Sequence, residues 1–435
     1  MGLISFINKY GIPLFLIILH FCGDFINYVA IICSSIYLAI YYLSKSKVDL
    51  YKIFLLLVPS IIFKDKLEFS DADLIFSSNL PKIYNTIIIG PLALSSRFIF
   101  SLSVPIKLLL TFNKNKDRLL VLLWFFSVAL SIIGLYYSYF SNSENSSGLT
   151  VGFRIALSLG IVLSPLVVEV KSFYKELNYI LLTSLCLLFL NLITNHWYFV
   201  ILGFLPYLGY CNKKLIPLIL YIFVSILFTS IFKLTIMLAL VFSIIFSSLV
   251  FFNIGAVKKI IMKILIIIFP LLLTIIVLCI QSNGYYDLST IEGFAYFKLL
   301  GDRKPIWDAS FNQIIHSSFF IGEAGNVLSV YFDFNNTIVD WSAGSHNIFL
   351  EIGRQLGVIN FIILTILLFV KLFKTSFIIT SKQEYLLFFG FISVYLSIGL
   401  TGQAIIYDGV GAMFWLIFSQ LFWVVKSQRT VSNLL

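Results

Sequence analysis

Residues 260–280 read IIMKILIIIFPLLLTIIVLCI, and Lys263 is the only charged residue among them. About 20 largely apolar residues are enough for an α-helix to cross the hydrocarbon core of a bilayer. Apolar runs recur along the rest of the chain, for example at residues 215–232 and 361–370. We therefore expect this stretch, and the others like it, to form membrane-spanning helices.

The composition of the whole chain supports the same conclusion. Hydrophobic residues make up 60% of the 435 residues and charged residues only 11%, whereas soluble domains have about 25% charged residues. This composition excludes a water-soluble fold. The net charge of +10 would suggest a nucleic-acid partner in a soluble protein, but here lysine and arginine collect in short loops, and we expect no nucleic acid. The five cysteines are scattered without a CxxC pair, so we expect neither a disulfide framework nor a metal site.

Small clusters of basic residues alternate with pairs of apolar runs. Cytoplasmic loops of membrane proteins carry an excess of lysine and arginine, so the pattern predicts helical hairpins with both chain termini in the cytoplasm. The expected fold is an all-α polytopic membrane protein with about 12–14 transmembrane helices. The predicted spans are residues 4–22, 25–43, 51–63, 86–111, 119–140, 151–170, 178–194, 197–211, 215–232, 234–252, 260–280, 347–370, 385–402 and 408–425.

One polar segment, residues 281–345, is by far the longest between predicted spans, and the basic clusters place it outside the cell membrane. The sequence thus predicts three regions. Residues 1–280 would form a bundle of about eleven spans, residues 281–346 a large external loop with short helices, and residues 347–435 about three further spans. Loops held by a rigid scaffold often carry function.

His346, one of only four histidines, stands where the polar segment becomes apolar, in the stretch SHNIFLEIGRQLG (residues 345–357). Ionisable groups beside membrane spans are costly and therefore suggest function. Two interpretations remain open. One is an interfacial helix start capped by Ser345 or Asn347, and the other is half of a reaction site. Arg354 follows Glu351 by one turn, and the two are expected to pair.

Arg303 lies in GDRKPIWDASFNQI (residues 301–314), which has the pattern of a short amphipathic helix after Gly301. Trp307 suits a membrane interface. An arginine at the head of a helix lying on the bilayer can bind a lipid phosphate with two hydrogen bonds, and ordinary anchoring to lipid headgroups is the alternative. The apolar side of the helix would comprise Ile306, Trp307, Phe311, Ile314 and Ile315.

Further cations lie at the expected outer ends of spans. Lys233 interrupts an apolar stretch, with snorkelling to the interface as the alternative explanation. Arg154 begins the span at 151–170, where an interfacial arginine is the simpler interpretation. Arg97 lies deeper and would need a carboxylate, a carbonyl oxygen or a water-filled cavity. At one depth, Lys233 and Arg154 together with Arg303 and His346 predict a site for a lipid-linked phosphate.

The order of these residues resembles the large-loop motif of bacterial O-antigen polymerases and the related O-antigen ligases. Those families have an arginine shortly before a tryptophan in the loop, then a His-Asn pair, a leucine, and a glycine about ten residues later. Lys233 occupies the place of a basic residue that is commonly arginine in those families. The motif-level match covers about 120 residues. The matching positions are Arg303, Trp307, His346, Asn347, Leu350 and Gly357.

This resemblance implies a membrane glycosyltransferase in the bacterial inner membrane, with its active site facing the periplasm. The donor would be a glycan on undecaprenyl diphosphate. The acceptor would be a second lipid-linked repeat unit in a polymerase, or lipid A-core in a ligase. No metal, nucleotide sugar or other cofactor is implied, and no Asp-x-Asp-like pair or histidine cluster suggests a metal. A partner that regulates polysaccharide chain length is implied by the family alone.

The residues can be assigned roles in such a reaction. Arginine and lysine at the membrane surface would stabilise charge on the departing diphosphate, which gives this role to Arg303 and Lys233, and a weaker one to Arg154. A histidine has a pKa suited to a general base, so His346 would activate the acceptor hydroxyl group. Asn347 would orient the loop or bind sugar, and Trp307 would contribute to the substrate site. The rival bases are His316 and Glu323.

Three functions remain open from the sequence. We favour the polymerase, because polymerases vary widely in sequence and this chain is divergent. The ligase is the first alternative, since the motifs barely separate the two. A flippase for lipid-linked oligosaccharides is the second, although transporters of this size usually have paired repeats and broken helices near the membrane midplane, and the sequence shows neither clearly.

Overall fold

The computed structural model describes most of the chain as a helical protein. The described residues are 3–20, 22, 24–61, 86–89, 92–111, 118–141, 169–189, 195–216, 219, 234–250, 256–280, 290, 293, 303–322, 328–334, 337–401 and 410–432.

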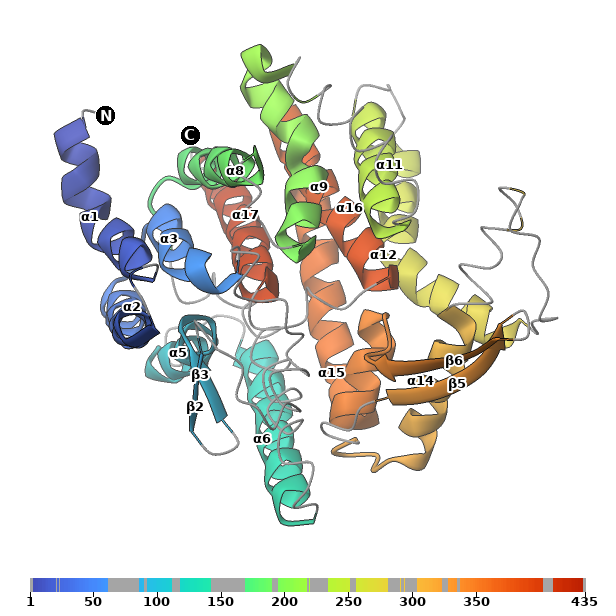
Figure 1. Ribbon diagram of the computed structural model, residues 1–435. Helices are drawn as coiled ribbons and strands as arrows, with labels where there is room; N and C mark the ends of the chain where they lie inside the picture. The colour runs from blue at the N-terminus through green and yellow to red at the C-terminus, as the bar shows by residue number, and fades with distance from the viewer. Residues whose placement is uncertain are drawn as a thin grey trace.

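Thirteen α-helices make up most of this described part (Figure 1). In a membrane the backbone N–H and C=O groups have no water to bond, and an α-helix satisfies them within a single segment. The helices are α1 (Leu3–Leu19), α2 (Asp24–Ser44), α3 (Leu50–Ile61), α5 (Ser96–Leu110), α6 (Arg118–Ser141), α8 (Phe173–Phe189), α9 (Asn195–Cys211), α11 (Leu234–Leu249), α12 (Ala256–Cys279), α14 (Lys304–His316), α15 (Ile348–Ile378), α16 (Lys382–Thr401) and α17 (Val410–Ser432), and a single 3-10 turn, η4, covers Lys213–Leu215.

Helices lie at twelve of the fourteen predicted spans. The other two spans, 151–170 and 215–232, fall almost entirely outside the described residues. Within the described part, three helices are long and apolar enough to cross a membrane: Ile260–Cys279, Ile348–Ile378 and Lys382–Leu400. Seven shorter helices are also apolar. The chain is therefore consistent with an all-α membrane protein.

Outer helices present large apolar side chains on their surface, as expected where lipid replaces water. Examples from α1, α2, α6 and α12 are Phe15, Phe25, Leu119 and Ile276, and all four are exposed. Exposed apolar area on this scale would favour aggregation in a soluble monomer. In a bilayer it is the surface that contacts the hydrocarbon.

Short strands occur at two places where the all-α prediction had none. The predicted span at 86–111 begins with an antiparallel hairpin of β2 (Thr86–Ile89) and β3 (Leu92–Ser95), and only then continues as α5. Short apolar runs rich in β-branched residues can form either strands or helices, and the Gly90-Pro91 pair between them is a turn signal. In addition, β1 (Lys47–Val48) pairs in parallel with β4 (Glu169–Val170).

A second hairpin lies in the large polar segment, where short helices alone were expected. β5 (Leu328–Phe334) pairs antiparallel with β6 (Thr337–Ala343), with Tyr331 opposite Asp340. The hairpin lies beside α14 (Figure 1). Runs rich in aromatic and β-branched residues on both sides of Asn335-Asn336 could have predicted it, because asparagine favours turns.

Basic clusters that were predicted to share one side of the membrane are neighbours in the structure. The pairing of β1 with β4 joins Lys47 to the segment before α8. The Lys263 ammonium group donates to the carbonyl oxygen of Ser376 at the far end of α15, and to the hydroxyl group of Tyr385 in α16 (3.2 Å). The side of the membrane on which these clusters lie stays a prediction.

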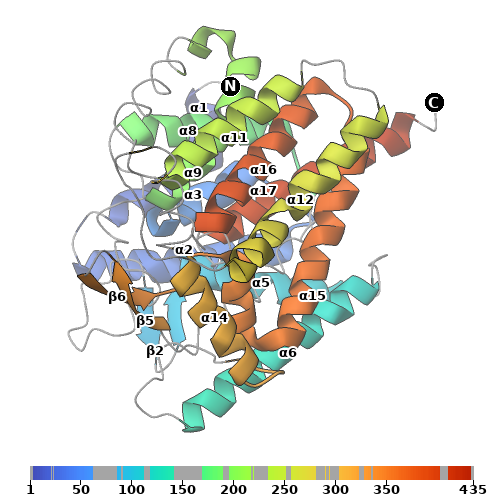
Figure 2. The ribbon, with the colours of Figure 1, turned by 90° about the vertical axis from the view of Figure 1, so that its right-hand side faces the viewer.

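Helix α12 connects this basic end of the bundle with the large polar segment. Its first turn contains Lys258 and Lys259. Near its other end, Thr274 accepts a hydrogen bond from Asn347 and Leu278 accepts one from Lys304. Figure 2 shows α12 and α15 running side by side toward α14. Lys258 and Lys259 thus lie at the opposite end of α12 from α14.

Helices α9 and α16 cross at two glycines. A Cβ atom added to Gly203 would lie 2.5 Å from Cγ2 of Val394 and 2.8 Å from the carbonyl oxygen of Gly390. Membrane helices often pack through small residues, which let the backbones approach closely. This crossing joins the middle of the chain to its C-terminal helices.

Replacing Gly203 with alanine is expected to weaken this crossing, because the Gly390 backbone cannot move aside without shifting α16. An overpacked core costs about 1–3 kcal/mol, so the midpoint of thermal unfolding in detergent should fall. Gly209→Ala on the same helix is the control, since its added Cβ would lie 3.4 Å from the nearest side chain. Equal unfolding midpoints for the two variants would contradict the expectation.

Candidate functional site

Helix α14 begins directly after Arg303, in agreement with the short helix predicted for this stretch. Arg303 has helical backbone angles (φ −86°, ψ −40°) and a half-buried side chain. Beside it, the Lys304 ammonium group forms a salt bridge with Asp308 (3.0 Å) and donates to the carbonyl oxygen of Leu278 at the end of α12 (3.2 Å). Lys304 therefore ties the start of α14, and Arg303 with it, to the helix bundle.

Trp307 does not face the surface of the protein, and its depth in a membrane stays a prediction. Its side chain is 1% exposed and lies in a small apolar core together with Ile306, both on α14. Further along α14, Phe311 and Ile315 are exposed. The predicted apolar stripe therefore splits, with one part packed in the protein and one at its surface. Further members of the small core are Val277, Leu328, Leu350 and Leu400.

Helix α14 packs against the first turns of α15. The contact is close at Gly353, where an added Cβ would lie 2.9 Å from Cδ1 of Ile314. The helix headed by Arg303 thus lies alongside the helix that His346 precedes (Figure 2). The structure brings these two sequence motifs, separated by some forty residues, into one region.

The backbone of His346 has an unusual conformation. Its φ angle is +49°, and among the described residues no other non-glycine residue has a positive φ. The left-handed conformation costs roughly 1–2 kcal/mol for a residue with a Cβ atom, although histidine adopts it more readily than most residues. The side chain is half-buried. Strain of this kind persists only where the surroundings enforce it, and it is concentrated at functional sites.

Asn347 is the N-cap of α15, which confirms the capping interpretation. Its side-chain oxygen accepts hydrogen bonds from the backbone N–H groups of Phe349 (3.0 Å) and Leu350 (3.3 Å). Its amide nitrogen donates to the hydroxyl group of Thr274 in α12 (2.7 Å). The side chain is fully buried. Asn347 thus fixes the start of α15 against α12, while a contact with sugar stays a prediction.

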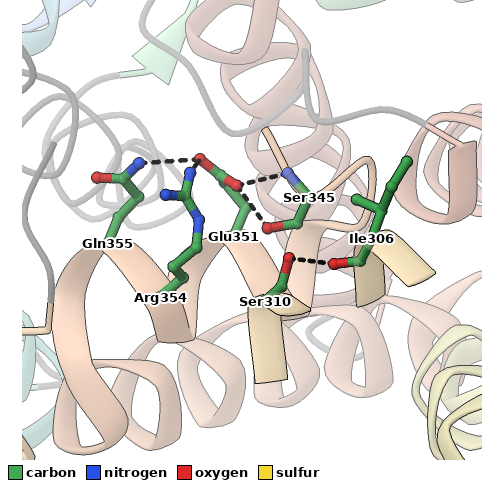
Figure 3. A network of polar contacts seen from close by, with 6 residues as sticks. All are labelled: Ile306, Ser310, Ser345, Glu351, Arg354 and Gln355. Atoms are coloured by element: carbon green, nitrogen blue, oxygen red, sulfur yellow. Dashed lines mark hydrogen bonds and ion pairs between the residues drawn. The ribbon is translucent and has the colours of Figure 1, made fainter. Parts of the chain in front are cut away.

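A network around Glu351 includes Ser345, the residue directly before His346 (Figure 3). Oε2 accepts from the backbone N–H (2.9 Å) and the hydroxyl group (2.7 Å) of Ser345. Oε1 accepts from Nη2 of Arg354 (2.8 Å) and Nε2 of Gln355 (3.1 Å). The predicted pair of Glu351 and Arg354 is confirmed, but it is buried in the protein, which places a charged pair where it needs these further hydrogen bonds.

The hydrogen bonds between Ser345 and Glu351 were not predicted from the sequence. The available signal was a glutamate and an arginine in an otherwise apolar stretch, where buried charges must be paired. The spacing alone gave no reason to expect the carboxylate to reach back past His346.

Helix α15 is interrupted at Gly357, the last residue of the motif. Gly357 has φ +82° and ψ 167°, which are not helical angles. Gly322 also has a positive φ, +60°, and the two glycine backbones meet here, since a Cβ added to Gly322 would lie 2.5 Å from the Gly357 nitrogen. The backbone N–H of Ile359 donates to the carbonyl oxygen of Phe319 (3.3 Å). The turn after α14 therefore fills the break in α15.

The remaining predicted residues are placed as follows. Lys233, Arg154 and Glu323 lie outside the described residues, and only the backbone of Arg97 is described. His316, at the end of α14, is exposed. The described structure thus brings together the loop arginine, the tryptophan and the His-Asn pair. Within that described portion no group of three metal-binding side chains occurs.

No protein-family model, no curated protein and no solved structure matches this chain. The candidate site accordingly rests on the residues of this chain and on their arrangement.

Proposed function

We propose that this protein is an O-antigen polymerase, a metal-independent glycosyltransferase of the bacterial inner membrane. It would join oligosaccharide repeat units carried on undecaprenyl diphosphate at the periplasmic face, in lipopolysaccharide biosynthesis. One observation carries the proposal: the helix headed by Arg303 packs against the helix start that holds the strained His346. A cation and a titratable side chain at the same end of the bundle support this reaction, and the order of the motif residues supports the family.

The proposed reaction needs two kinds of help. The acceptor hydroxyl oxygen forms a bond to the anomeric carbon of the donor sugar, while the bond from that carbon to the diphosphate oxygen breaks. His346 takes the hydroxyl proton, and the diphosphate leaves with the undecaprenyl chain. Arg303 stabilises the charge that develops on the leaving group, with Lys233 and Arg154 as further proposed cations.

The small core around Trp307 supports the proposed function because it makes the site rigid. Trp307 would shape the site by fixing α14 against α12 and α15, because its side chain is buried among their residues. The strands β5 and β6 between the two motifs add a rigid connection, and Leu328 of β5 belongs to the same core. Catalytic groups work best on such rigid support.

The experiment that tests the function is the glycolipid ladder of a deletion strain. A polymerase deletion should leave a single repeat unit on lipid A-core and remove all longer chains. Loss of every repeat unit from lipid A-core would instead identify the ligase. Repeat units trapped on the cytoplasmic side would identify the flippase. Either of these last two results would overturn the proposal.

Complementing that strain with Arg303→Ala should restore almost no long chains. Loss of one group that stabilises developing charge lowers the rate by about a hundredfold or more. Arg303→Lys should recover part of the activity, because lysine keeps the charge but not the two-pronged geometry. Arg118→Ala, at an exposed arginine that begins α6, is the control. Wild-type chain lengths from a well-expressed Arg303→Ala protein would remove Arg303 from the mechanism.

A further inference from the structure

The residues directly before and after His346, Ser345 and Asn347, both form side-chain hydrogen bonds with other parts of the protein. On one side, the N–H group (2.9 Å) and hydroxyl group (2.7 Å) of the buried Ser345 both donate to Glu351. On the other side, Asn347 caps α15 and donates to Thr274 of α12. These bonds fix the chain immediately before and after the residue with the positive φ angle.

The bonds of Glu351 differ from those of an ordinary helix cap. In a capping box, the side chain at the third helical position reaches back to the backbone N–H group of the N-cap residue. Here the N-cap is Asn347, Glu351 is the fourth helical residue, and its carboxylate reaches Ser345, two residues before the cap. The carboxylate therefore spans His346 instead of stopping at the end of the helix.

The carboxylate itself is held firmly. Its second oxygen accepts from Arg354 (2.8 Å) and from Gln355 (3.1 Å), and Glu351 is only 1% exposed. A group buried in this way does not touch a substrate that arrives from outside. Its two bonds to Ser345 connect Glu351 to the residue directly before His346.

We propose that Glu351 is a positioning residue, which holds His346 in its left-handed conformation through the two bonds to Ser345 and so presents the imidazole to the acceptor hydroxyl group. That the imidazole faces an acceptor hydroxyl group rests on the proposed function. The positioning of His346 by Glu351 does not depend on that function. Misplacing a reacting group by about 1 Å can slow a reaction by about a hundredfold. Loosening the turn should therefore lower kcat and leave KM, which depends on the bound diphosphate and sugars, nearly unchanged.

The test begins with Ser345→Ala, which removes one of the two bonds and leaves Glu351 and His346 in place. Ser345→Thr keeps the hydroxyl group and is the rescue variant. Ser310→Ala is the matched control, because Ser310 is also fully buried, and its hydroxyl group donates to the carbonyl oxygen of Ile306 in its own helix (2.7 Å; Figure 3). Glu351→Gln is a second variant that keeps the side-chain shape but loses the charge.

The first readout is independent of catalysis. Diethyl pyrocarbonate acylates neutral imidazole, and mass spectrometry of the full-length protein in lipid nanodiscs gives the rate at His346 as a function of pH. Because a loosened turn exposes the ring to the reagent, Ser345→Ala and Glu351→Gln should raise the rate by about threefold or more. Ser345→Thr and Ser310→Ala should match the wild type. In the polymer assay, Ser345→Ala should lower kcat by about tenfold with little change in KM.

The outcomes separate the positioning role from the proposed function. Wild-type acylation of His346 in both Ser345→Ala and Glu351→Gln would overturn the positioning role, whatever polymer is made. An equal loss of kcat in Ser345→Ala and Ser310→Ala would also overturn it, since a general packing defect would then be sufficient. The expected change in acylation, with no polymer even from the wild type, would support the positioning role and refute the polymerase.

Discussion

Replacing His346 with asparagine should stop polymer formation while the protein stays folded and inserted in the membrane. Asparagine tolerates a positive φ angle as well as histidine does, so the turn with φ +49° keeps its shape. Its amide cannot accept a proton, and a general base contributes about 10²–10⁴-fold to a rate. The change therefore removes the chemistry and preserves the backbone, which alanine, a poor residue for this conformation, would not do.

The measurement is the ladder of lipid A-core-linked chains in a deletion strain that expresses each variant. His346→Gly is the companion, because glycine relieves the backbone strain but also lacks a base, and it should be equally inactive. His316→Asn, at the exposed end of α14, tests the rival histidine and should leave the ladder intact. Long chains from His346→Asn at normal protein levels would exclude His346 as the base.

Gly357→Ala should be among the most destabilising single changes in this protein. An added Cβ would lie 2.8 Å from the nitrogen of Gly322 and 2.9 Å from the nitrogen of Ile321 and the carbonyl carbon of Phe320. All three are backbone atoms, which cannot rotate away as a side chain can. The φ angle of +82° adds strain for any residue other than glycine. Overpacking and strain together predict a loss of about 3 kcal/mol or more.

Gly11→Ala provides the control for this prediction. Gly11 lies inside α1, and its added Cβ would meet nothing closer than Cγ2 of Ile7 at 3.7 Å. Alanine is the better helix former by about 1 kcal/mol, so this variant should be as stable as the wild type or slightly more stable. Thermal unfolding in detergent compares the two. A Gly357→Ala protein that unfolds with the wild-type midpoint would mean that the turn after α14 does not pack in the break of α15.

The parts of this site that were predictable from the sequence are local in the chain. The Asn347 cap bonds to backbone groups two and three residues away, and Arg354 pairs with a carboxylate three residues earlier. Such contacts depend on helix geometry, which the sequence pattern already indicates. The positions of most helices were predictable for a related reason, since each apolar run forms its backbone hydrogen bonds within itself.

The parts that were not predictable depend on distant segments. Trp307 is an amphipathic residue that suits a membrane surface, and only the packing of α12, α15 and β5 around it makes it a core residue. The left-handed turn at His346 depends on Ser345 and on Thr274, which lies far earlier in the chain. Hairpin β2–β3 formed where an apolar run fits both strand and helix, a choice that periodicity alone does not make.

The break in α15 divides the helix into two parts that can lie at different depths in a membrane. As one straight helix, α15 would be about 46 Å long, well above the roughly 30 Å thickness of the hydrocarbon core. After Gly357, residues 358–378 measure about 31 Å, which matches that thickness. Residues 358–378 alone can then cross the hydrocarbon core. The residues before the break, which include Glu351 and Arg354, can lie outside it. A single helix can in this way provide both a full crossing and a separate segment beyond it, next to the turn at His346.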